Sequence, residues 1–118
     1  MTRTADEPPL AIVSAMHQEL RALLPLLQHA RRVERAGRSF HLGELHGHPV
    51  VLALSGIGKV AAATTTTLLI HSFQARALVL TGVAGGLAHG VNVGDVVVAQ
   101  QLLQIGRASC RERVWSDV

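Results

Sequence analysis

The sequence has very few aromatic residues: no tyrosine, two phenylalanines and one tryptophan among 118 residues. A core with so few rings must be filled by Val, Leu, Ile and Ala, as in a parallel sheet covered by helices. The basic stretch from Arg31 to Arg38 has no interleaved aromatic residue on which a nucleic-acid base could stack. We therefore interpret this stretch as a solvated basic edge and expect no nucleic-acid partner.

Cysteine and long apolar runs are also scarce. The single cysteine, Cys110, excludes an internal disulfide and fits a reducing compartment. No run reaches the length of about 18 apolar residues that a membrane-spanning helix needs. The N-terminus lacks the apolar segment of a signal peptide. We therefore expect a cytoplasmic protein without a membrane partner.

Six apolar or alternating runs predict the strands of one mixed sheet. Gly47 suits a tight turn between the third and fourth of them. The predicted fold class is α/β, a truncated three-layer α/β/α arrangement with a mixed twisted sheet. The expected strands are Leu10–Ala15, Arg31–Arg35, Ser39–Leu45, Pro49–Leu54, Ala77–Leu80 and Asp95–Leu103.

Two helices are expected between these strands, after a disordered leader at residues 1–9. The first follows a leucine pattern from Leu20 to Leu27 with the i, i+3, i+4, i+7 spacing of a helix face. Pro25 interrupts it and should kink the helix or end it. The second helix is expected over Lys59–Phe73 and opens at a glycine junction.

Two glycine loops follow strands that we expect to be parallel. They are Ser55–Val60 and Thr81–Gly86, and such strand-to-loop junctions are where α/β proteins place ligands. A P-loop is excluded, because Val60 stands where that motif needs a Ser or Thr. The G-x-G-x-x-A pattern that ends at Ala61 resembles a dinucleotide fingerprint, but the next strand ends without the carboxylate that binds the ribose.

Glu19 adds a carboxylate to the same predicted sheet edge. It follows the first strand, so its side chain could orient or deprotonate a water molecule there. The alternative is an acid placed at a helix start because the helix dipole favours it there. For the loops, the alternative is that they only supply tight turns. A carboxylate together with two loops favours a binding site.

Together these segments resemble the 5′-methylthioadenosine/S-adenosylhomocysteine nucleosidases of the nucleoside phosphorylase superfamily. The resemblance extends from about Leu10 to Gln104 and covers only the N-terminal part of a typical member. It rests on four motifs in order: Ala15–Glu19, Ser55–Ala63, Thr81–Leu87 and Asn92–Val98.

The resemblance implies hydrolysis of the N-glycosidic bond of methylthioadenosine or adenosylhomocysteine, with release of adenine. Glu19 falls on the water-activating glutamate, Met16 and Ile57 on positions near the ribose and the water, and Val83 and Gly85 on the loop beside the nucleoside. It also implies a cytoplasmic homodimer at full length. Such an enzyme uses neither cofactor nor metal and acts in purine nucleoside catabolism and methionine salvage.

The chain departs from the family pattern in several places. His17 and Gln18 stand where the family often has acids, and Val83 replaces a serine that helps to hold the water in many members. The adenine-protonating aspartate, the ribose-binding Met-Glu pair and the base-stacking aromatic of the family lie beyond Gln104. We therefore expect this chain alone to be inactive.

Two other functions remain open at this point. A phosphorolytic enzyme of the same fold needs a basic residue at the site, for which Lys59 and Arg76 are poorly placed. A non-catalytic nucleoside-binding module is the other. The pair His46 and His48 suggests a metal, but no third ligand is evident, and we interpret both as surface turn residues.

Residues 105–118 differ from the rest of the chain. They hold the only cysteine and the only tryptophan, and Ile105–Val114 resembles a translated short-read sequencing adapter. We expect a non-native tail over 105–118, with the nucleosidase-type domain over 10–104. On this interpretation Cys110 carries no information about the compartment.

Overall fold

A computed structural model describes residues 7–104 of the chain. The chain divides into two compact units at Gly82 and Val83, and each is described by itself. The expected leader at residues 1–9 is described only from residue 7, where residues 7–9 have no regular structure. The expected tail over 105–118 lies outside the described residues.

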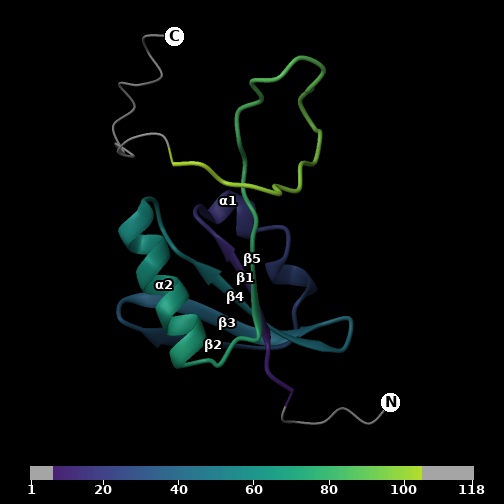
Figure 1. The fold of residues 1–118 in the computed structure, drawn as a ribbon. Coiled ribbons are helices and arrows are strands. Elements are labelled where there is room, and N and C mark those ends of the chain that lie inside the picture. Colours follow the sequence, from purple (N-terminus) through teal and green to yellow (C-terminus); the bar gives the residue numbers. More distant parts are fainter. Residues whose placement is uncertain (1–6, 105–118) are drawn as a thin grey trace. The chain divides into compact units, whose positions relative to one another are not determined.

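The first unit holds a mixed sheet, as predicted, with five of the six expected strands (Figure 1). Its order is β2-β3-β4-β1-β5, with β1 parallel to both β4 and β5, and β2, β3 and β4 antiparallel. The strands are β1 (Leu10–Ser14), β2 (Gln28–Arg35), β3 (Arg38–Leu45), β4 (His48–Leu54) and β5 (Ala77–Leu80).

Tight turns fix the antiparallel half of the sheet. Between β3 and β4 the central turn residues His46 and Gly47 have φ values of 50° and 78°, as a two-residue turn between twisted strands requires. The turn predicted at Gly47 is therefore confirmed. Ala36 and Gly37 make an equivalent turn between β2 and β3, with φ values of 50° and 71°.

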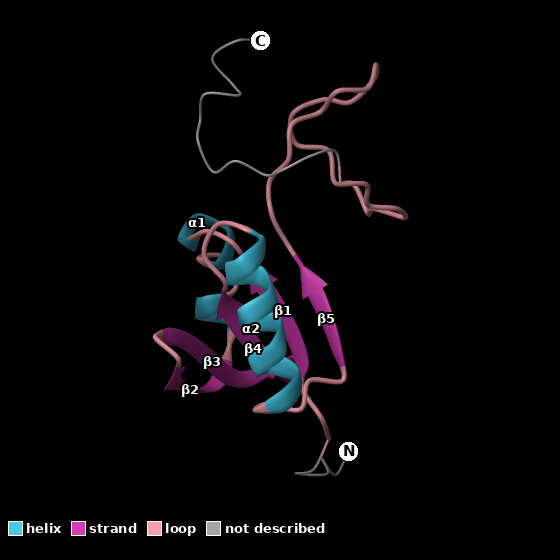
Figure 2. Ribbon diagram, turned by 60° about the vertical axis from the view of Figure 1, so that its left-hand side comes forward, coloured by secondary structure: helices cyan, strands magenta, loops and turns pink. Residues whose placement is uncertain are grey.

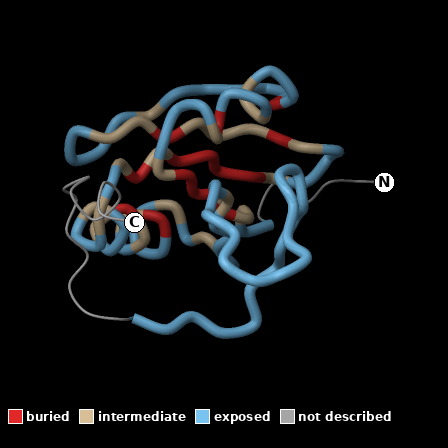
Figure 3. Tube along the Cα trace, turned by 90° about the horizontal axis from the view of Figure 1, so that it is seen from above, coloured by how far each residue is buried: buried red, intermediate tan, exposed pale blue. Residues whose placement is uncertain are grey.

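Helical elements cover both faces of the sheet (Figure 2). On one face α2 (Lys59–His71) places Leu69 against Phe40 and Val51. On the other face α1 (His17–Leu20) and the 3₁₀ turn η1 (Leu24–Leu26) belong to a cluster around Leu52. Successive residues of β4 are buried on opposite faces, and burial is concentrated in the central strands (Figure 3). The three-layer α/β/α prediction is confirmed for this unit.

The first predicted helix is shorter than expected. The α-helix ends at Leu20, and the chain then turns into η1, in which Pro25 occupies an initial position. Proline has no N–H to donate to the preceding turn, so the leucine pattern is satisfied by two short pieces instead of one helix. The second helix is confirmed. Its threonine run fits because Thr64 and Thr65 each donate a 2.8 Å hydrogen bond to the carbonyl four residues back.

In the second unit the prediction of a strand over Asp95–Leu103 is wrong. Residues 83–104 contain neither helix nor strand, and Val96 and Val98 are 91% and 86% exposed. A strand needs a neighbour to satisfy its backbone groups, and apolar sequence alone does not supply one. The local order described here consists of turns, in one of which the Asn92 N–H donates to Asp95 Oδ2 at 2.8 Å.

Candidate functional site

The carboxyl ends of β1, β4 and β5 lie at one edge of the sheet, because the three strands are parallel. Backbone hydrogen bonds connect β1 to the first residue of each glycine loop. The Ser55 N–H donates to the Ser14 carbonyl at 2.8 Å, and the Thr81 N–H donates to the Val13 carbonyl at 2.9 Å. This confirms that both loops begin at the edge where β1 leads into α1.

Glu19 lies at this edge, and the backbone holds its carboxylate. Its Oε2 accepts hydrogen bonds from the Ala15 N–H at 2.9 Å and the Met16 N–H at 3.0 Å. On its other side the carboxylate lies against Gly82, where an added Cβ atom would stand 3.2 Å from Oε1. The half-buried carboxylate therefore has a defined orientation beside the start of the second glycine loop.

Sequence reasoning missed a pair of hydroxyl groups beneath this edge. Ser14 Oγ and Thr81 Oγ1 are 2.8 Å apart, and Ser14 is fully buried. The Ser55 hydroxyl lies nearby and donates to the Gly56 carbonyl at 2.8 Å. A signal was available in the sequence, because each of these residues is the first polar one after an apolar run. The hydroxyl bond links β1 to the residue that follows β5.

The first glycine loop leads directly into α2. Gly58 precedes the helix with φ of 106°, a value that favours glycine. Ile57 is 68% exposed and Met16 is 40% exposed, so both side chains are accessible to a ligand. Met16 is connected to Glu19 through its own N–H. Met16, Ile57 and Glu19 thus follow strand ends at one edge, as expected.

Val83 and Gly85 belong to the second unit. Val83 is 83% exposed, and a Cβ atom added at Gly85 would meet nothing within 4 Å. Their role beside a nucleoside stays a prediction.

Residues 7–104 contain no group of three or more His, Cys, Asp or Glu side chains that could hold a metal ion. His46 and His48 are exposed at the turn between β3 and β4. Within the same residues, the structure has no helix with the length and apolar character that crossing a membrane requires.

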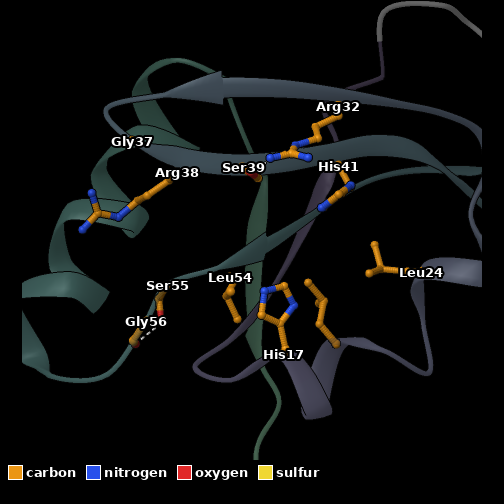
Figure 4. Close-up of a pocket in the computed structure, with 11 residues that line it drawn as sticks. His17, Leu24, Arg32, Gly37, Arg38, Ser39, His41, Leu54, Ser55 and Gly56 are labelled. Atoms are coloured by element: carbon orange, nitrogen blue, oxygen red, sulfur yellow. Dashed lines mark hydrogen bonds between the residues drawn. The ribbon is translucent and has the colours of Figure 1, made fainter.

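A groove of about 530 Å³ opens between α1 and the β2–β3 hairpin (Figure 4). Ser55 and Gly56 of the first glycine loop border it, so it adjoins the edge described above. Burial lowers the pKa of His41 in its wall, and the positive charges of Arg32 and His17 lower it further. No local sequence pattern indicated that these side chains meet. The groove residues are His17, Leu20, Leu24, Arg32, Gly37, Arg38, Ser39, His41, Leu54, Ser55 and Gly56.

Comparison with known proteins connects this edge to a family. Residues 9–113 match the model of the phosphorylase superfamily. The 5′-methylthioadenosine/S-adenosylhomocysteine nucleosidase of Bacillus thuringiensis subsp. konkukian is 43% identical over 93 residues, which are 79% of this chain and 40% of the relative. The chain thus spans about 40% of the length of the curated relatives that it matches.

Solved structures agree with this relationship. The nucleosidase of Colwellia psychrerythraea in complex with adenine is 46% identical with a TM-score of 0.72, over 74% of this chain and 36% of the other. The Streptococcus pneumoniae nucleosidase with the transition-state inhibitor MT-ImmA is 40% identical with a TM-score of 0.72, over 74% and 38%. The resemblance to these nucleosidases is confirmed, and the chain belongs to the phosphorylase superfamily.

Proposed function

We propose that this chain forms the water-activating part of an enzyme that hydrolyses 5′-methylthioadenosine or S-adenosylhomocysteine. The observation that carries the proposal is the Glu19 carboxylate, which two backbone N–H groups hold at the edge where both glycine loops begin. The similarity to nucleosidases that act on these two nucleosides supports the substrate class.

In the proposed reaction, a water molecule attacks C1′ of the ribose while the bond from C1′ to the adenine nitrogen breaks. Glu19 accepts a proton from the water, and the leaving adenine takes up a proton from an acid. The electron pair of the broken bond stays with adenine. We place that acid, together with the ribose-binding residues, outside the part of the relatives that this chain matches.

Met16 and Ile57 are proposed to contact the ribose, since their exposed side chains follow the same strand ends as Glu19. Val83 and Gly85 are proposed to line the nucleoside. We further propose a cytoplasmic homodimer of methionine salvage, on the basis of the family resemblance alone. The proposed nucleosidase-type domain covers residues 10–104, with the segment 105–118 foreign to it.

The test uses a longer protein, which is encoded by the source genome when its reading frame is continued past codon 104. Adenine release from methylthioadenosine is measured for this protein and for its Glu19→Gln variant. We expect the variant to lose about 100-fold or more in kcat, because a positioned base typically contributes 10²–10⁴, with little change in KM. Glu34→Gln is the matched control, because it removes the same charge from an exposed position on β2.

Equal kcat values for the wild type and Glu19→Gln would refute Glu19 as the base. If the source genome encodes residues 105–118 in frame directly after codon 104, the proposal that this segment is foreign to the domain is refuted.

A further inference from the structure

Four cationic or titratable side chains line the groove beside α1. Arg32 and His41 are paired across the β2–β3 ladder, and His17 faces them from α1 (Figure 4). Arg38 lines the end of the groove beside α2, where its Nε donates to Thr65 Oγ1 at 3.0 Å. Among the described residues, those that line the groove include neither Asp nor Glu. The wall therefore carries positive charge without a carboxylate in the lining.

Arg32 retains donors for a ligand. Its Nε donates to Ser39 Oγ at 3.1 Å and its Nη2 donates to Glu34 Oε1 at 2.6 Å, which uses two of the five N–H donors of a guanidinium. The pair with Glu34 is exposed, at 62% and 64% of the two side chains. Exposed ion pairs of this kind are weak, so they do not prevent Arg32 from binding an anion.

The opposite wall of the groove is apolar. Leu20 comes from α1, Leu24 from η1 and Leu54 from the end of β4. Leu20 is 1% exposed and belongs to the core cluster beneath α1, so this wall is fixed. A cavity with an apolar wall and a few convergent polar groups is typical of a small-molecule site.

We propose that this groove binds the carboxylate or phosphate group of a small organic anion, with Arg32 as its charge partner and His17 and His41 as further N–H donors. The leucine wall accepts the apolar body of the same ligand. This inference does not depend on turnover at Glu19.

Two sources could supply the anionic group. One is the 5′ substituent of a nucleoside bound at the Glu19 edge, because Ser55 and Gly56 border the groove and His17 directly follows Met16. S-adenosylhomocysteine has a carboxylate in that substituent, and methylthioadenosine has none. The other source is a separate anion, for which inorganic phosphate is the simplest probe.

The experiment titrates the isotope-labelled full chain with inorganic phosphate, S-adenosylhomocysteine and methylthioadenosine, and follows the ring signals of His17 and His41 by NMR. We expect at least one of the two anionic probes to move both signals, and methylthioadenosine to leave them in place. A response to S-adenosylhomocysteine assigns the anion to the nucleoside, and a response to phosphate alone assigns it to a separate ligand.

Substitutions identify the charge partner. Arg32→Gln should raise the Kd of the responding probe about tenfold, as the loss of a charge-assisted hydrogen bond does, and Arg32→Lys should restore most of the affinity. Arg76→Gln is the matched control, because Arg76 is exposed at the opposite end of the sheet, where its N–H donates to the Pro9 carbonyl.

Three results would overturn the inference. The first is that neither anionic probe moves the histidine ring signals. The second is that methylthioadenosine moves these signals as far as the anionic probes do. The third is that Arg76→Gln raises the Kd of the responding probe as much as Arg32→Gln does. If adenine release proves absent in the longer protein while phosphate still binds here, the proposed function fails and this inference stands.

Discussion

At the scale of single residues, Glu19 has a structural role beside the catalytic role that we propose for it. Its carboxylate accepts two backbone N–H groups before α1, which is a common use of an acid at a helix start. The same bonds fix the direction of the carboxylate toward Gly82. The two readings of this acid, structural and catalytic, are therefore compatible, and experiments at neighbouring residues can separate them.

Gly82→Ala should displace the Glu19 carboxylate. An added Cβ atom would stand 3.2 Å from Oε1, which is closer than ordinary contact. In the longer protein we expect kcat to fall about tenfold to 100-fold, because small misplacements of a catalytic group are costly. In the present chain the Glu19 carboxyl carbon signal should shift. Gly85→Ala, where the added atom meets nothing within 4 Å, should leave that carbon signal unchanged.

His41 should make stability depend on pH. Burial and the charges of Arg32 and His17 lower its folded-state pKa below the ordinary 6.5. As the pH falls through 6.5, the unfolded chain therefore binds a proton before the folded chain does. The free energy of unfolding decreases over this range, and the contribution of His41 becomes constant once the pH is below its lowered folded-state pKa. Urea unfolding from pH 8 to pH 5 should show a smaller loss of stability in His41→Gln than in the wild type. Parallel losses in both proteins would contradict this expectation.

At the scale of elements, the edge strand β5 pairs only with β1 among the described strands. The bond between Ser14 Oγ and Thr81 Oγ1 adds a side-chain link at the end of that pairing. Because Ser14 is fully buried, removal of one hydroxyl leaves its partner poorly satisfied. This link therefore contributes to the attachment of β5.

A double-mutant cycle of Ser14→Ala and Thr81→Val measures this link. Each single substitution should lower the free energy of unfolding by about 1–2 kcal/mol, and the double variant should lose less than the sum, with a coupling of about 1 kcal/mol. Thr67→Val is the control, since its hydroxyl bonds only within α2 and is exposed; it should change stability by less than about 0.5 kcal/mol. Strict additivity would show that the two hydroxyls act independently.

The prediction of helices and strands from the sequence succeeded where the local residue pattern determines the element. It failed where the element depends on a neighbouring strand. The strands from Leu10 to Leu54 and the turn at Gly47 follow from alternation and turn chemistry. Asp95–Leu103 has the composition of a strand, but composition does not provide the neighbour that a strand requires. For the site, the order of strands and glycine loops predicted where Glu19 lies, whereas the groove at Arg32 depends on strand register, which no local pattern shows.

At the scale of the whole molecule, the chain spans about 40% of the length of its curated relatives. We expect this chain by itself to release adenine no faster than its own Glu19→Gln variant, because the acid that protonates adenine is expected elsewhere in the enzyme. Incubation with methylthioadenosine and chromatographic measurement of adenine would check this. Turnover that Glu19→Gln abolishes would show that the acid lies within these residues.

The position of β1 in the sheet has a consequence for the order of folding. β1 lies between β4 and β5 in the sheet and precedes both in the sequence, so both of its partners are synthesised long after it. The β2–β3–β4 meander needs only local contacts and can form while β1 is still unpaired. Pulse-labelled hydrogen exchange during refolding should therefore protect Phe40 and Leu52 amides before those of Ala11 and Val13. Until β5 is complete, β1 has an open edge, and at that stage it is the strand most exposed to mispairing and aggregation.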